Sequence, residues 1–395
     1  MTTRRDPLID RLRFPLAVAV VCMHVNIWID RGSPAALASL FAQGAVAYVL
    51  APLAICIFFL MSGYLFFGGA WGGQTADGLK AWSWPAYGRK LRGRLRSLLV
   101  PYVVWIVLAL LMHYALDAVV PAVRAGATMP SLWQFWQDCG GWHVFYDARV
   151  YPSGEQWLFG YAMPRAMPYN PPMWFLRDLI VMTLCAPLFW LVVRRLHAVG
   201  LWLLGALYLL QLWPPYVGPT AGGVFWFCLG ASVALRGGRL GDAFRPYART
   251  AAVAAALLFV PRLVARDEFT AALSPLFALC GVAAFLGYVT ERTRLLPASL
   301  LLAESGFFIF LVHPFVLVGV EGLLRCVPLG GALWSLASYV LAVAATVAVC
   351  VALFAAMRRF TPRLLSVLSG QRGFPPASVV APPDVPKQEI NNNTQ

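Results

Sequence analysis

The sequence predicts an all-α membrane protein, a polytopic bundle of about ten transmembrane helices with both termini in the cytoplasm. Of its 395 residues, 60% are hydrophobic and only 12% are charged, which is far from the balance of a soluble domain. The apolar residues fall into runs of about 17 to 25 residues, the length at which a helix crosses a bilayer. Loops rich in Lys and Arg alternate with loops that hold few, as expected for a chain that crosses the membrane repeatedly.

The apolar runs define the predicted helices in order, although Pro or Gly interrupts several of them. The runs cover residues 13–30, 44–67, 97–120, 172–194, 198–214, 220–236, 249–266, 271–290, 299–321 and 333–356. This arrangement predicts one transmembrane domain over residues 1–366. The remaining residues, 367–395, are rich in Pro and Asn and are predicted to form a disordered tail.

The net charge of +14 is interpreted as a topology signal rather than as a nucleic-acid-binding surface. Most of the 31 Lys and Arg residues fall in segments that the ten-helix arrangement places inside the cell. The densest of these segments contains Arg89, Lys90, Arg92, Arg94 and Arg96. The lipid bilayer is therefore an expected partner, and nucleic acid is not.

The longest predicted connection, residues 121–171, lies on the outer side. The segment is too long for a simple connector. It is also rich in Trp, Tyr, Phe and Pro, which makes it too aromatic for a flexible linker. We expect this outer loop to pack over the outer mouth of the bundle.

The eight cysteines show no metal-ligand spacing, so no metal site is predicted. Six of them lie inside predicted helices, where cysteine acts as a small apolar residue. Cys139 and Cys326 fall in outer loops, where an oxidising compartment would permit a disulfide, and the sequence leaves that bond open.

Ionisable side chains within membrane helices are costly, so they are the best pointers to function. In the first predicted helix, Arg13 and His24 are eleven residues apart, which places them within about 20° of one face and about 16 Å apart along the axis. Asp10 lies one turn before Arg13 and can pair with it. A snorkelling arginine and a structural, hydrogen-bonded histidine would give the same pattern.

Two further helices carry such residues. Trp174 and Arg177 share one face near the outer end of the run at 172–194, where they could also be ordinary interface anchors. In the run at 299–321, Glu304 and Ser305 lie toward the inner end and His313 follows about 13 Å further along the axis. Pro314 comes next, and proline in a membrane helix frees a backbone carbonyl where a cavity is built. Two histidines on separate helices favour proton-transfer chemistry, because imidazole exchanges protons near neutral pH.

These residues occur in an order that resembles a known family of membrane enzymes. The segment Ile9 to His24 contains an arginine, ten residues and then a histidine, which are Arg13 and His24. Further matches are Phe58 to Tyr64 with its Ser62-Gly63 pair, the basic segment ending Arg94 to Tyr102, Met173 to Leu179, and Ser305 to Pro314. On these segments the chain resembles the acyltransferase-three family, whose members O-acetylate lipopolysaccharide, exopolysaccharides and other surface glycans. The chain departs from the family where Phe14-Pro15 follow Arg13, a place where members often carry glycine.

The resemblance implies an acyltransferase that transfers groups other than amino-acyl groups. Its donor would be acyl-CoA, commonly acetyl-CoA, used as a co-substrate with no bound cofactor. Its acceptor would be a hydroxyl of a cell-surface glycan or of its lipid-linked precursor, and its location a bacterial inner membrane.

The site follows from the same resemblance. His24 is expected to be the general base for the acceptor hydroxyl, or else a transient acyl carrier, with Arg13 and His313 completing the catalytic group. The residues expected to bind substrate are Asp10, Ser62, Trp174, Arg177 and Ser305. The phosphates of the donor are expected to meet Arg89, Lys90, Arg92, Arg94 and Arg96, although topology alone would also explain that basic cluster.

A proton-coupled transporter or flippase of a glycan-related substrate is the alternative, since it too would place histidines, arginine and proline in a bundle. The sequence shows no inverted repeat of the kind that many transporters have, which favours the enzyme.

Overall fold

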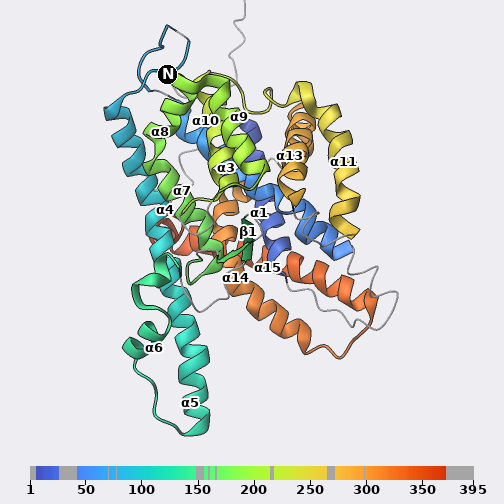
Figure 1. Cartoon of the computed structure of the whole chain (residues 1–395). Coiled ribbons are helices and arrows are strands. Elements are labelled where there is room, and N and C mark those ends of the chain that lie inside the picture. The colour runs from blue at the N-terminus through green and yellow to red at the C-terminus, as the bar shows by residue number, and fades with distance from the viewer. Residues whose placement is uncertain are drawn as a thin grey trace, which may run out of the picture.

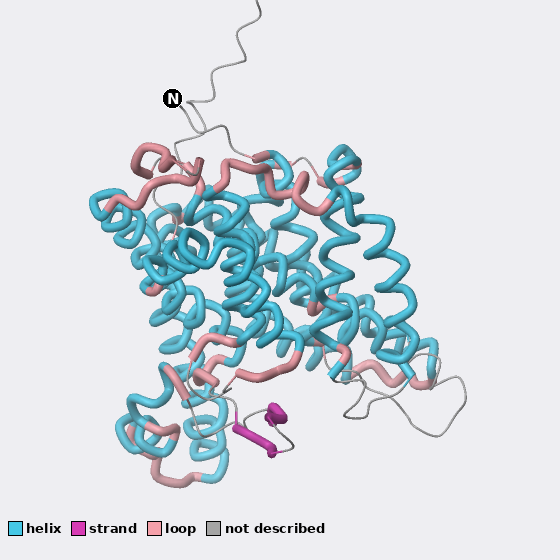
Figure 2. Tube along the Cα trace, turned by 45° about the horizontal axis from the view of Figure 1, so that its top comes forward, coloured by secondary structure: helices cyan, strands magenta, loops and turns pink. Residues whose placement is uncertain are grey.

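The computed structural model describes residues 6–25, 42–69, 71–76, 78–147, 155–158, 161–164, 167–213, 218–264, 272–297 and 299–370. Over these residues helices run side by side, and most of the loops collect at the two ends of the bundle (Figures 1 and 2). A single two-stranded antiparallel hairpin, β1 (Glu155–Leu158) with β2 (Tyr161–Pro164), lies at one end (Figure 2). The predicted all-helical class is confirmed.

Five helical stretches of the described chain are long and apolar enough to cross a membrane. They are Trp84–Ala125, Ala186–Leu209, Ser274–Glu291, Leu300–Arg325 and Ala332–Phe360. Two shorter apolar helices, α3 (Leu53–Phe67) and α10 (Ala221–Leu235), pack against each other within the bundle. The protein is therefore a membrane protein, while the count of ten spanning helices and the cytoplasmic side of the termini stay predictions.

Local signals explain where the first helices begin. α1 (Pro7–His24) begins six residues before the predicted run, because the Asp6 carboxylate accepts the backbone N–H of Leu8 and Pro7 suits the first helical position. α4 (Trp84–His113) begins thirteen residues before its predicted run, with Ser83 as its N-cap. The basic cluster therefore lies on a helix rather than in a loop before one.

The remaining helices follow the other apolar runs. They are α7 (Trp174–Leu184), α8 (Ala186–Leu191), α9 (His197–Leu209), α11 (Ala248–Val264), α13 (Ser274–Glu291), α14 (Leu300–Arg325) and α15 (Ala332–Phe360). α1 packs on α14, α14 on α15, and α11 on α13. Figure 1 shows α1 and α14 in the middle of the molecule and α4 along one edge.

Glycines allow the closest helix contacts. A Cβ atom at Gly306 of α14 would lie 2.9 Å from the backbone oxygen of Arg13 in α1. A Cβ at Gly63 of α3 would lie 2.0 Å from the backbone oxygen of Phe227 in α10. Both contacts are with backbone, which cannot swing aside, so each crossing requires glycine.

The outer segment 121–171 is partly structured. It contains α5 (Val120–Ala125), α6 (Leu132–Asp138), the 3₁₀ turns Gly141–Phe145 and Pro171–Met173, and the hairpin. Part of it packs onto the helices, because the Tyr102 hydroxyl of α4 donates to the Phe145 carbonyl. Other parts project beyond the bundle, as α5 and α6 do in Figure 1.

A short terminal helix corrects the predicted domain boundary. α16 (Pro362–Ser369) runs past residue 366, and the indole N–H of Trp105 donates to its Leu368 carbonyl at 2.9 Å. Residues 367–370 are thus part of the folded bundle, because Leu365 and Ser369 are buried against it. The rest of the predicted tail, 371–395, lies outside the described residues. Cys139 and Cys326 are both free thiols.

Candidate functional site

The structure brings the two predicted membrane histidines together. His24 is the last residue of α1, His313 lies midway along α14, and their ring centroids are 4.9 Å apart in an edge-to-face arrangement. His313 is fully buried, whereas His24 is partly exposed. Because Arg13 also meets Gly306, the two helices run in the same direction and stay in contact for several turns.

Backbone carbonyls determine which nitrogen of each ring carries the proton. Nδ1 of His24 lies 2.8 Å from the Val20 carbonyl oxygen. Nδ1 of His313 lies 2.8 Å from the Phe310 oxygen and 3.1 Å from the Ile309 oxygen. A carbonyl oxygen can only accept, so Nδ1 is the donor in both rings and each neutral imidazole has its lone pair on Nε2. Nε2 of His313 has no hydrogen-bond partner among the described residues.

A cavity of about 280 Å³ lies toward the amino-terminal ends of α1 and α14, away from the histidine pair. Arg13 of α1, Ser62 of α3 and Arg94 of α4 all line this inner cavity, and so does Glu304 of α14. Glu304 is already paired with Arg358 of α15 at 2.6 Å. Arg13 is likewise paired with Asp10, so the positive character of the cavity comes from Arg94.

Aromatic rings connect the inner cavity to the histidine pair. Phe175 and Phe310 line the cavity, and their ring centroids are 5.6 Å apart. Phe310 is also next to His313, with ring centroids 6.3 Å apart. An apolar wall thus stands between the arginines and the imidazoles, which suits a ligand with a charged end and an apolar end.

The carboxylate of Asp10 positions Arg13. The two form an ion pair at 3.3 Å on successive turns of α1, with the arginine side chain 40% exposed. Asp10 does not line the inner cavity, so its expected role in binding substrate can only act through Arg13.

The basic cluster divides between two faces of α4, as the helical period requires. Arg94 lines the inner cavity, and together with Lys90 it lines an adjoining cavity of about 250 Å³. Arg89, Arg92 and Arg96 are exposed and line neither cavity. Only two of the five predicted donor-binding residues are therefore placed toward the site.

Two lysines meet the carboxyl end of α3. The ammonium of Lys90 donates to the carbonyls of Phe66, at 2.9 Å, and Gly68, and lies over the Trp71 ring. Lys80, in the loop that follows α3, donates to the Phe67 carbonyl, and burial lowers the pKa of its ammonium. Cations at this end stabilise the helix through its dipole, so both lysines also have a structural role.

Arg177 and its neighbour form a buried clamp. Asp178 accepts from two nitrogens of Arg177, at 2.9 and 3.1 Å, and also from the backbone N–H of Thr220 that begins α10. Arg177 donates in addition to the Tyr146 carbonyl at 3.0 Å and lies over the Tyr146 ring. The clamp joins α7, α10 and the outer segment, and Arg177 does not line the inner cavity.

Trp174 and Ser305 also lie beside the site rather than in it. Trp174 packs on Phe59, with ring centroids 6.0 Å apart. The Ser305 hydroxyl is buried and donates to the Leu302 carbonyl at 3.0 Å, and neither residue lines the inner cavity. Their expected contacts with substrate stay predictions.

Some residues of the site carry no signal in the sequence. Ser97 of α4 and Gly370 after α16 both line the inner cavity, although they are 273 positions apart in the chain. Arg358 neutralises Glu304, and nothing in its position at the end of an apolar run distinguishes it from a topology signal. Among the described residues, no group of three or more His, Cys, Asp or Glu could hold a metal ion.

A comparison with known families agrees with this geometry. A family model described as an acyltransferase domain matches residues 6–355. The matched region includes the histidine pair and the lining residues of the inner cavity named above, apart from Gly370. Arg358, which pairs with Glu304, also lies beyond it. No curated protein and no solved structure matches the chain. The chain belongs to the acyltransferase-3 family and is an acyltransferase of the membrane.

Proposed function

We propose that this enzyme transfers an acyl group, of which acetyl is the expected one, from acyl-CoA to a hydroxyl of a cell-surface glycan or its lipid-linked precursor. Its location would be the bacterial inner membrane. The observation that carries the proposal is the contact of His24 with His313, because in both rings a backbone carbonyl holds Nδ1 and leaves the lone pair on Nε2. Such a pair supplies a proton acceptor within an apolar bundle.

The inner cavity suits the donor. Phosphates bind guanidinium groups through charge-assisted hydrogen bonds, which Arg13 and Arg94 can offer. Arg13 and His24 are about 16 Å apart along α1, a distance that an extended pantetheine arm spans. The thioester would then lie among the aromatic rings that lead to the histidines.

We assign the role of general base to His24, because its ring is the more exposed of the two and can meet the acceptor hydroxyl. Nε2 of His24 takes the proton of the acceptor hydroxyl while the oxygen attacks the thioester carbonyl carbon. The carbon–sulfur bond then breaks, and the CoA sulfur takes the proton back from the imidazolium. His313 lies against the His24 ring and restricts its orientation, while Asp10 restricts Arg13.

The test measures acceptor-dependent release of free CoA from acetyl-CoA by purified protein, with extracted host surface polysaccharide as acceptor. We expect His24→Ala to lower the rate by roughly 10²- to 10⁴-fold, the usual contribution of a general base. The matched control is His197→Asn, which removes an exposed imidazole that lies outside the histidine pair and keeps a polar side chain at that position.

Near-normal release by His24→Ala, with the variant inserted at the wild-type level, would contradict the general-base role. If the wild type binds the glycan but never releases CoA, a transporter or flippase explains the bundle better, because a carrier turns over no donor.

A further inference from the structure

A second cavity lies at the other end of the helix pair that holds the histidines. Its volume is about 600 Å³, within the range of small-molecule sites. Val25, the residue after His24, lines it, and so does Glu321, which follows His313 by about two turns of α14. This terminal cavity and the inner cavity therefore lie on opposite sides of the histidine pair.

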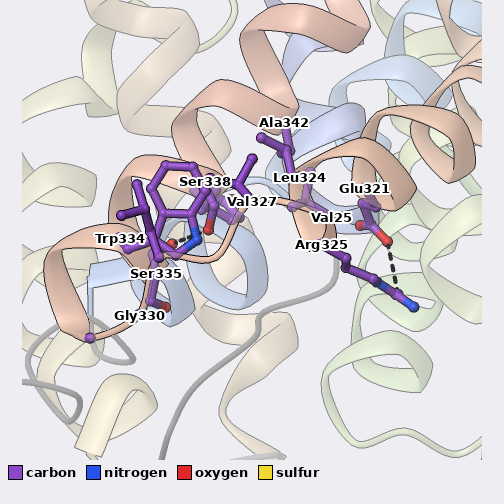
Figure 3. A pocket seen from close by; sticks show the side chains of 13 residues that line it. Val25, Glu321, Leu324, Arg325, Val327, Gly330, Trp334, Ser335, Ser338 and Ala342 are labelled. Carbon is purple, nitrogen blue, oxygen red and sulfur yellow. Dashed lines mark hydrogen bonds and ion pairs between the residues drawn. The ribbon is translucent and has the colours of Figure 1, made fainter.

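The lining of the terminal cavity combines one carboxylate, hydroxyl groups and an indole (Figure 3). Glu321 is buried, with 7% of its surface exposed, and forms a long ion pair of 3.8 Å with Arg325 at the rim. The first turns of α15 contribute Trp334, Ser335 and Ser338. Trp334 and Ser338 are four residues apart, so they lie on the same face of that helix.

The chemical groups of the lining suit a ligand that carries hydroxyl groups. Ser338 donates its hydroxyl proton to the Ser335 carbonyl at 2.9 Å, so its oxygen can accept. A carboxylate can only accept, and it binds the O–H donors of a ligand strongly. Arg325 is a donor that reaches the same space, with its side chain 53% exposed.

The indole of Trp334 adds a wide, rigid and apolar face. A sugar ring presents just this combination, with hydroxyls around its edge and C–H groups on its faces. A lipid chain would not use the carboxylate, and the Glu321 and Arg325 pair offers the phosphates of a nucleotide no net positive charge. The net charge of the Glu321 and Arg325 pair is zero, which favours a neutral sugar.

We propose that the terminal cavity is the subsite that holds the sugar of the acceptor, with Trp334 stacking on the ring and Glu321 and Ser338 binding its hydroxyls. This assignment rests on the proposed transfer to a glycan and adds the place where the glycan binds. It also explains the layout of the molecule, because donor and acceptor would approach the histidine pair from opposite ends of α1 and α14.

The experiment compares Trp334→Ala and Glu321→Gln with wild type in the full-length protein. The probe is a set of neutral oligosaccharides released by mild acid from the host surface polysaccharide. Their binding is measured by calorimetry without any acyl-CoA, and the KM for the same oligosaccharides is measured from CoA release. The matched control is Leu333→Ala, next to Trp334 but 86% exposed and outside the cavity lining.

We expect each cavity variant to raise both the Kd and the KM for the oligosaccharides at least tenfold, with the KM for acetyl-CoA at the wild-type value. Leu333→Ala should leave all three constants unchanged. If the wild type binds the oligosaccharides but releases no CoA, and the cavity variants lose this binding, the subsite is supported and acyl transfer is refuted. Normal oligosaccharide binding and KM in both variants, in an enzyme that does release CoA, would overturn the subsite and leave acyl transfer standing.

Discussion

At the scale of single residues, two arginines of the same basic cluster have different surroundings. Arg94 lines the inner cavity, whereas Arg92, two positions earlier, is exposed. If the cavity binds the donor, Arg94→Ala should raise the KM for acyl-CoA by roughly ten- to a hundredfold, because a hydrogen bond to a charged group is lost. Steady-state kinetics with varied acyl-CoA measures this. Arg92→Ala is the control, and an equal effect of both variants would mean that the cluster acts only through its general charge.

The buried clamp of Arg177 and Asp178 makes a prediction about stability. Asp178→Ala leaves a guanidinium buried without its carboxylate and should cost about 3 to 5 kcal/mol, with a lower Tm in detergent. The control is Glu291→Ala, which breaks an exposed pair with Arg245 and should cost less than about 1 kcal/mol. A Tm for Asp178→Ala equal to that of the control would show that the clamp contributes little to the fold.

At the scale of helices, the contact of α1 with α14 sets the distance between the histidines. Gly306→Ala places a methyl group 2.9 Å from a backbone oxygen of α1, so the helices must separate at a cost of about 1 to 3 kcal/mol. We expect lower activity and a lower Tm. Gly319→Ala on the same helix meets no atom within 4 Å and should be neutral or slightly stabilising. Full activity in Gly306→Ala would show that the site tolerates this movement.

At the scale of the whole molecule, the distribution of Lys and Arg predicts which end of the bundle faces the cytoplasm. Cys326 is exposed in the turn after α14 and should react with a membrane-impermeant maleimide in intact cells, provided that the other seven cysteines are replaced. A cysteine at Arg239, an exposed residue of a predicted inner loop, should react only after permeabilisation. The reverse labelling pattern would mean that the bundle is inverted and that the arginine-lined cavity faces outward.

Hydropathy and charged residues within apolar runs can be recognised one residue at a time, so they predict the helical class, the membrane character and two candidate histidines. Even the pairing of Asp10 with Arg13 followed from the helical period. The predicted start of α4 is thirteen residues too late. Ser83 and Pro85 are typical of the beginning of a helix, but the basic turns that follow them have a low hydropathy and are not included in the apolar run.

Which of these residues come into contact depends on how the helices pack. The contact of His24 with His313 joins positions 289 residues apart and depends on the packing of α1 against α14 at Gly306. The packing of α4 left Arg92 exposed and Arg94 beside the cavity, and the contacts of α7 with α10 and the outer segment placed Arg177 in a structural clamp. Periodicity specifies which face of a helix a side chain occupies, but not which helix that face contacts, because the neighbour is chosen by long-range packing.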